Sequence, residues 1–328
     1  MQSQLAYSRD FEREADRVGF DTLQKAGFDV SAMPAFFERL QRAGRAYDSN
    51  APVYVRSHPL TTERIADVRN RAQGARYRQR VDSLSFQLAR AKLRATADAS
   101  VDGVRDALKF FSSQLADKTY ASEAAARFGH AEALLLARDF KGAQGALALM
   151  PKGIAHPMID AQAARVRSAV GDTAGAVSLL RNAAARYPQA RHLRVALAET
   201  LQVDGKHAEA IELLVEQART HRGDARIFEM QARSFAATGR TMAQHQALGE
   251  YYALVSGAQA AMEQFQIARC AGGGDFYQQS ILDSRIRDMW ERMVAERADR
   301  GEGDKGLAPA DAAARARLPV QQLPGRCP

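Results

Sequence analysis

Two carboxylates near the start of the chain share the spacing of a helical site. Glu12 and Asp16 are four residues apart in FEREADRVGF, so a helix places both on one face, whereas Glu14 points elsewhere. Paired carboxylates occur in the active sites of acid–base enzymes and in metal-binding sites. Taken alone, however, this stretch is typical of a solvated helix face. The spacing identifies candidates and leaves their role open.

The other side chains that bind metals or act as nucleophiles form no complete motif. None of the seven histidines has another histidine four residues away, so the zinc-binding motif HExxH is absent. His58 precedes Pro59, where a histidine ordinarily caps a helix or contacts a loop. Cys270 and Cys327 lie 57 positions apart without a CxxC pattern and therefore form no metal-ligand pair. An even cysteine count fits a disulfide in an oxidising compartment, and the sequence leaves their pairing open.

The first 78 residues read as helices separated by turns. A first helix is predicted to run to Lys25 and to stop at Gly27, a common C-terminal cap. A second is predicted from about Ser31, with Pro34 in its first turn. Its apolar face is predicted to hold Met33, Phe36, Phe37 and Leu40.

From about residue 80 the sequence repeats with a period close to 34 residues. Each unit reads as an apolar helix, a glycine-containing turn and a second helix that opens with a small residue. Tetratricopeptide repeats have about 34 residues in two antiparallel helices, and close helix crossings need small side chains. With the small residue of the second helix as a marker, the units step by 33–36 residues through Ala107, Ala143, Ala176, Ala210, Gln244 and Ser280.

The pattern predicts an all-α fold with three parts: a helical segment over residues 1–78, a tetratricopeptide-like α-solenoid over 79–297, and a flexible tail over 298–328. The first helices of the units are expected to line a groove that binds protein partners. By repeat position, the groove residues are Arg165, Ser168, His192, Glu199, Gln202, Arg226, Glu229 and Arg233. Replacing Arg165 or Arg233 by alanine is expected to weaken partner binding and to leave stability nearly unchanged.

The charge of the chain is unevenly distributed. The formal net charge is +8, and residues 64–94 hold nine basic and two acidic side chains. Such a stretch could contact acidic proteins or a membrane surface, although a solvated arginine-rich helix surface is the more ordinary interpretation. Nucleic acid is not expected, because no aromatic residues interleave with the basic ones in a recognised module.

Three motifs in order resemble a known family. They are the ExxxD helix, the turn AGFD followed by MP, and RSHPLTTERIADVRNRA. The chain resembles the BepA/HtpX-type zinc metallopeptidases, and most closely BepA-like periplasmic proteases with a tetratricopeptide tail. The resemblance covers about residues 5–75 in detail and implies that residues 1–78 are the C-terminal part of a gluzincin metallopeptidase domain.

The resemblance implies roles for three residues. Glu12 matches the family's glutamate zinc ligand, Asp16 the aspartate that supports a ligand histidine, and His58 a loop histidine that can reach the metal. Catalytic zinc normally takes three protein ligands, so the missing HExxH leaves the site incomplete. We therefore expect no catalytic residue in this chain, no stoichiometric zinc and no catalysis by the chain alone, although zinc serves the full-length family.

The sequence is compatible with two functions. By resemblance the chain is a portion of a periplasmic metalloendopeptidase and chaperone in outer-membrane protein quality control, whose repeats bind partner proteins or unfolded outer-membrane clients. The alternative is a stand-alone tetratricopeptide scaffold without a protease role. The opening residues resemble the interior of a charged helix rather than a signal peptide, so truncation is expected.

Overall fold

A computed structural model describes residues 2–46, 62–75, 81–272 and 274–299. These residues form fifteen helices and no strand, which confirms the all-α prediction. The chain divides into two compact units, Met1–Ser83 and Leu84–Pro328. No helix in the described ranges has both the length and the apolar character needed to cross a membrane.

The first unit contains α1 (Gln2–Lys25), α2 (Ala32–Ala46) and α4 (Thr62–Gln73). As predicted, α1 ends at Lys25, and Gly27 follows with a φ of 76°, a backbone conformation that favours glycine. The core of this unit consists of Phe20, Val30, Phe37, Ile65 and Val68. The predicted apolar face of α2 is wrong at Phe36, which is 57% exposed because Phe37, its neighbour in sequence, faces the core.

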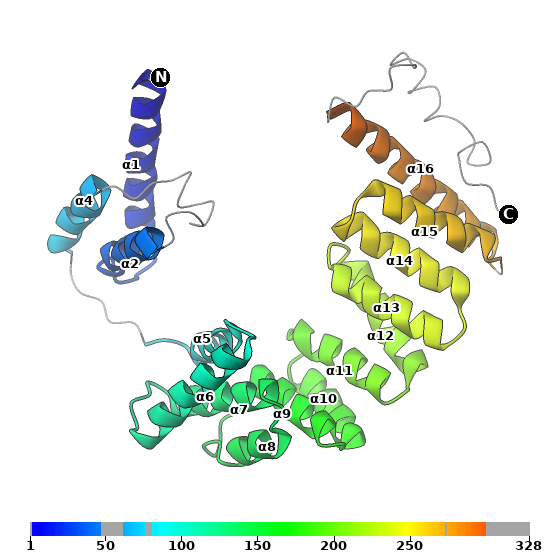
Figure 1. Cartoon of the computed structure of the whole chain (residues 1–328), viewed down its shortest axis with the longest axis horizontal. Helices are drawn as coiled ribbons and strands as arrows, with labels where there is room; N and C mark the ends of the chain where they lie inside the picture. The colour runs from blue at the N-terminus through cyan, green and yellow to red at the C-terminus, as the bar shows by residue number, and fades with distance from the viewer. Residues whose placement is uncertain (1, 47–61, 76–80, 273, 300–328) are drawn as a thin grey trace. The chain divides into compact units, whose positions relative to one another are not determined.

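The second unit is a series of six helix pairs stacked one after another (Figure 1). The pairs are α5 (Leu84–Thr96) with α6 (Val101–Ala116), α7 (Glu123–Leu136) with α8 (Phe140–Ala148), α9 (Pro157–Ala169) with α10 (Thr173–Arg186), α11 (Arg191–Val203) with α12 (His207–Thr220), α13 (Ala225–Ala237) with α14 (Thr241–Val255), and α15 (Ala258–Cys270) with α16 (Phe276–Asp299).

Local chemistry sets the ends of these helices. Asp172 caps α10 by accepting a hydrogen bond of 2.9 Å from the N–H of Gly175, and Asp139 caps α8 in the same way. Within the pairs α9/α10 and α11/α12, the turns contain Gly171 (φ 92°) and Gly205 (φ 73°). The turn within a helix pair therefore uses a left-handed backbone conformation, which favours glycine but is adopted by Arg138 (φ 60°) between α7 and α8.

Small residues occupy the close helix contacts of the central pairs. Ala164, Ala176, Ala198 and Ala210 are each at most 1% exposed, as the repeat pattern predicts. The last two markers do not have this role, because Gln244 is half-buried and Ser280 is exposed. In the final pair Leu282 and Ile286 of α16 are buried instead. The repeat period therefore continues into this pair, but other positions of the second helix are buried.

The second unit has several local cores rather than one. One cluster belongs to α5, α6 and α7 with Ile159 of α9, one extends from α9 to α13, one links α12, α13 and α14, and one joins α14, α15 and α16. Each pair therefore buries its apolar surface chiefly against its neighbours.

Candidate functional site

The candidate carboxylates of α1 surround a buried arginine of α4. Arg64 donates from Nε to Asp16 Oδ2 at 2.7 Å and from Nη2 to Asp16 Oδ1 at 2.8 Å. Its Nη1 lies 3.0 Å from Glu12 Oε2. We call Glu12, Asp16 and Arg64 the Arg64 cluster. The helical spacing correctly predicted that Glu12 and Asp16 lie on one face, but no sequence pattern predicted that Arg64 joins them.

The Arg64 cluster is largely removed from water. The side chains of Arg64, Asp16 and Glu12 are 8%, 8% and 16% exposed. The guanidinium carbon also lies 5.6 Å from the ring centroid of Phe37 in α2. A bidentate arginine–carboxylate pair is the strong form of such a contact, because two parallel hydrogen bonds fix its geometry. The cluster therefore links residues 48 positions apart in the sequence.

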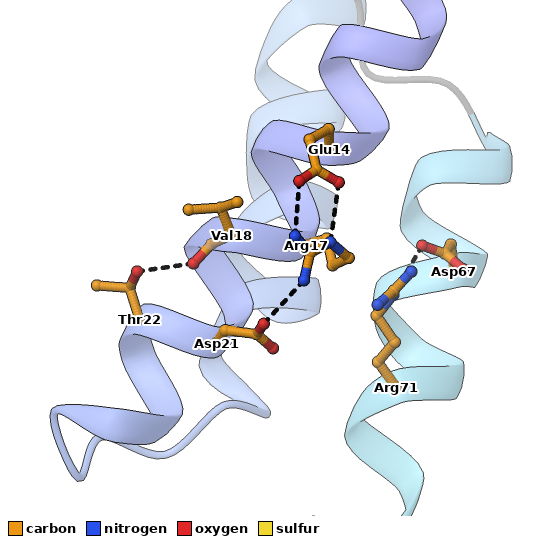
Figure 2. Close-up of polar contacts among 7 residues, drawn as sticks. All are labelled: Glu14, Arg17, Val18, Asp21, Thr22, Asp67 and Arg71. Atoms are coloured by element: carbon orange, nitrogen blue, oxygen red, sulfur yellow. Dashed lines mark hydrogen bonds and ion pairs between the residues drawn. The ribbon is translucent and has the colours of Figure 1, made fainter.

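Glu14 lies outside this cluster, as the helical spacing predicts. It accepts hydrogen bonds of 2.8 and 2.6 Å from Arg17, which also contacts Asp21, and Figure 2 shows these side chains along α1. The hydrogen bond from Arg17 lowers the pKa of Glu14. The side chain of Glu14 is 59% exposed, so these contacts belong to a solvated surface and add little stability.

The described residues do not fit a complete zinc site. His58 lies outside the described residues, and in the described ranges no three histidine, cysteine or acidic side chains group closely enough to hold a metal ion. One carboxylate oxygen of Glu12 faces Arg64, and both oxygens of Asp16 accept hydrogen bonds from it. The proposed ligand Glu12 and supporting residue Asp16 are thus held in place, but catalytic zinc needs further protein ligands.

Most of the predicted groove residues of the second unit lie on exposed surface. Arg226 pairs with Glu199 at 2.8 Å, and Arg233 lies 3.4 Å from Glu229. His192 is also exposed, and Ser168 is half-buried. Since the carboxylates and arginines largely pair with each other, this face has mixed charge. Its role in partner binding stays a prediction.

Gln202 departs from the predicted groove. It is 8% exposed, and its amide donates hydrogen bonds of 2.6 Å to the carbonyl of Met230 and to the hydroxyl of Ser234. The side chain therefore joins α11 to α13 instead of facing an open surface. Repeat position alone could not predict this, because burial depends on the helix of the next pair.

Arg165 has a structural contact that the repeat pattern did not predict. It donates to Oε1 of Glu132 at 2.7 Å, and Glu132 is only 2% exposed. The amide of Gln162 donates to Oε2 of the same carboxylate at 3.0 Å and to the carbonyl of Phe128. The signal in the sequence was a single glutamate within the otherwise apolar stretch AEALLLA.

We expect Arg165→Ala to destabilise the second unit by about 2 kcal/mol, because it removes the charge partner of a buried carboxylate. This corrects the expectation that the substitution is neutral. Arg233→Ala should change stability by less than about 0.5 kcal/mol, since both Arg233 and Glu229 are exposed. Urea unfolding of both variants checks the difference, and equal midpoints would show that Glu132 does not depend on Arg165.

Cys270 is the last residue of α15. Cys327 is the other cysteine of the sequence and lies outside the described residues. Their pairing stays a prediction. Closing a loop of this length stabilises a fold by about 4 kcal/mol in chain-entropy models.

Comparison with known proteins matches both units to families. Residues 1–72 match peptidase family M48, and residues 167–234 match a tetratricopeptide repeat family. A putative beta-barrel assembly-enhancing protease of Vibrio cholerae is 44% identical over 107 residues, which are 31% of this chain and 22% of that relative. The Escherichia coli K12 beta-barrel assembly-enhancing protease is 42% identical over 91 residues, covering 28% and 18%.

The longest of these matches is to the beta-barrel assembly-enhancing protease of Yersinia pestis, 28% identical over 241 residues. It covers 72% of this chain and 48% of that relative. The chain therefore spans less than half the length of each of these relatives.

The chain joins a segment that matches the M48 peptidases, a family of zinc metallopeptidases, to an array that matches tetratricopeptide repeats. Within that class it is similar to the BepA-like proteases, and the resemblance recognised in its motifs is confirmed.

Proposed function

We propose that this chain is a portion of a periplasmic zinc metalloendopeptidase of outer-membrane protein quality control, and that its repeats bind protein partners. The observation that carries the proposal is the order of the two family matches, M48 first and tetratricopeptide repeats second, in one polypeptide. The names of its relatives, beta-barrel assembly-enhancing proteases, support outer-membrane β-barrel proteins as the clients.

The first unit would supply only some of the residues of the metal site. Glu12 would be a zinc ligand, His58 a further candidate ligand, and Asp16 the residue that orients a ligand histidine. Zinc, when bound, would polarise the peptide carbonyl and activate a water molecule. Arg64 supports this arrangement by fixing both carboxylates on α1. Since HExxH is absent from the sequence, we propose that this chain alone does not hydrolyse peptides.

The experiment compares the chain with a longer product of the same reading frame. The purified chain should retain less than stoichiometric zinc and should not cleave casein. If the frame upstream of residue 1 encodes HExxH, the longer protein should bind one zinc and cleave casein, and Glu12→Ala should abolish both. Glu14→Ala is the matched control, because Glu14 is two residues away and faces solvent. Zinc and activity that survive Glu12→Ala would contradict the assignment.

The alternative is a stand-alone protein-binding scaffold. It predicts that the upstream frame lacks HExxH and that the chain binds an unfolded outer-membrane β-barrel protein as well as the longer product does. Contact of basic residues 64–94 with a membrane surface is a further proposal. Three of these arginines already form ion pairs with acidic side chains of the same chain: Arg64 in its cluster, Arg69 with Glu38 and Arg71 with Asp67. Arg90, Lys92 and Arg94 are exposed on α5.

A further inference from the structure

The start of the repeat array contains a groove between its first three helices. The groove encloses about 450 Å³ and is lined by side chains of α5, α6 and α7 and of the turn before α7. We call it the α5–α7 groove. It lies wholly within the second unit. None of the predicted groove residues of the later repeats lines it, whereas Arg90 and Arg94 of the basic stretch 64–94 do.

Packing explains why this space is open. Helices α5 and α6 both pack on α7, whereas α5 packs far less extensively on α6. The alanines Ala91, Ala125 and Ala126 take part in the lining and are themselves buried, and Phe111 beside them is 2% exposed. Because alanine side chains are short, they leave room that larger residues would fill. The result is a hollow with an apolar floor.

Two arginines give the groove its charge. Arg90 and Arg94 are four residues apart on α5, so they lie on one face of that helix, and both are exposed. The Arg94 guanidinium carbon lies 4.7 Å from the ring centroid of Phe110, and that of Arg90 lies 6.0 Å from the ring of Phe86. Within the described ranges neither arginine forms an ion pair, and no acidic side chain lines the groove.

Several arginines elsewhere in the array are instead compensated by acidic residues. Arginines such as Arg181, Arg226 and Arg285 are matched by glutamates on neighbouring helices. Arg90 and Arg94 instead lie over aromatic rings, which hold the guanidinium planes while leaving their N–H groups directed to solvent or to a ligand. The uncompensated positive charge is thus located at the rim of an apolar hollow.

We propose that the α5–α7 groove binds an acidic peptide segment that carries an aromatic side chain. Carboxylates of the peptide pair with Arg90 and Arg94, and the aromatic side chain packs on Phe110 and Tyr120 above the alanine floor. The Gln114 amide, which also lines the groove, can bond the peptide backbone. A flat bilayer surface would contact the two arginines and leave the hollow empty, so the concave shape favours a peptide.

This inference goes beyond the proposed function, because it needs neither the metal site nor the groove of the later repeats. The test uses the full chain and fluorescence polarisation of a short fluorescein-labelled peptide of aspartates and glutamates around one phenylalanine. At about 0.15 M salt, where long-range attraction is screened, the double variant R90A/R94A should weaken binding at least about tenfold, since each lost charge-assisted contact is a strong one. Replacing the peptide's phenylalanine by alanine should weaken binding to the unmodified chain as well.

The matched control is K109A/K141A, which removes the same charge from exposed positions outside the groove. It should bind the peptide within about twofold of the unmodified chain. Equal weakening by the two double variants would overturn the proposal in favour of non-specific charge attraction. Absence of peptide binding would also overturn the proposal. If phosphatidylglycerol-containing vesicles bound through Arg90 and Arg94 while the peptide did not, the two arginines would form a membrane contact instead. None of these outcomes bears on zinc retention or on casein cleavage by the longer protein.

Discussion

Replacing Arg64 by alanine should unfold the first unit at neutral pH. Arg64 satisfies both oxygens of Asp16 and one of Glu12 in a site where all three side chains are at most 16% exposed. Breaking a buried ion pair by removing one partner costs about 3–5 kcal/mol, because the other charge stays behind without compensation. The apolar core of this unit is small, so a loss of this size should exceed its stability. Hydrogen exchange of α1, α2 and α4 should show lost protection.

The control for Arg64 lies two turns further along the same helix. Arg71 pairs with Asp67 on the surface, where the two side chains are 38% and 47% exposed (Figure 2). Arg71→Ala should change the free energy of opening, measured by hydrogen exchange, by less than about 0.5 kcal/mol. Arg64→Lys should give an intermediate loss, because one ammonium group cannot reproduce the bidentate contact. If Arg64→Ala and Arg71→Ala left equal protection, the Arg64 cluster would not support the unit.

Gly129→Ala should destabilise the second unit by about 1 kcal/mol. Gly129 lies inside α7, where a Cβ atom would be 2.3 Å from the Cε1 and Cζ atoms of Phe111. The Phe111 ring is 2% exposed and cannot move into solvent, so the added methyl group overpacks the contact between α6 and α7. Overpacking costs about 1–3 kcal/mol, which outweighs the gain of about 1 kcal/mol in helix propensity. Urea unfolding followed by circular dichroism measures the change.

Gly145→Ala provides a control of opposite sign. Gly145 is also inside a helix, α8, but a Cβ atom there would have no neighbour within 4 Å. The substitution should therefore stabilise the unit by about 0.5–1 kcal/mol through helix propensity alone. If the two alanine variants moved the unfolding midpoint in the same direction, contact with Phe111 would not determine the effect at Gly129.

The fold was predictable from the sequence wherever a local rule set the structure. The end of α1 at Lys25 followed from Gly27, and the central helix pairs followed from a period of about 34 residues with small residues at fixed positions. At Gln244 and Ser280 the period continued but the packing did not. Which side chain fills a helix contact depends on the shape of the neighbouring pair, and repeat position carries no information about it.

The candidate site was predictable only in part for a related reason. Helical spacing placed Glu12 and Asp16 on one face, and the family motif supplied their proposed roles. Arg64 was counted as part of a basic stretch, yet it is buried, because its partners come from a helix 48 residues earlier. Arg165 and Gln202 were likewise assigned to open surface, although both contact residues on the adjacent first helix. Contacts between distant segments decide whether a charged residue is solvated or structural.

The separate cores of the repeat array have a mechanical consequence. Since each hydrophobic cluster is closed by adjacent pairs, a pulling force applied at one end should release helix pairs in sequence, with several small force peaks in place of one large one. Pairs further along would keep their packing while the end pair is open. An applied force would therefore extend the array in steps, and the array would shorten again as the opened pairs restack.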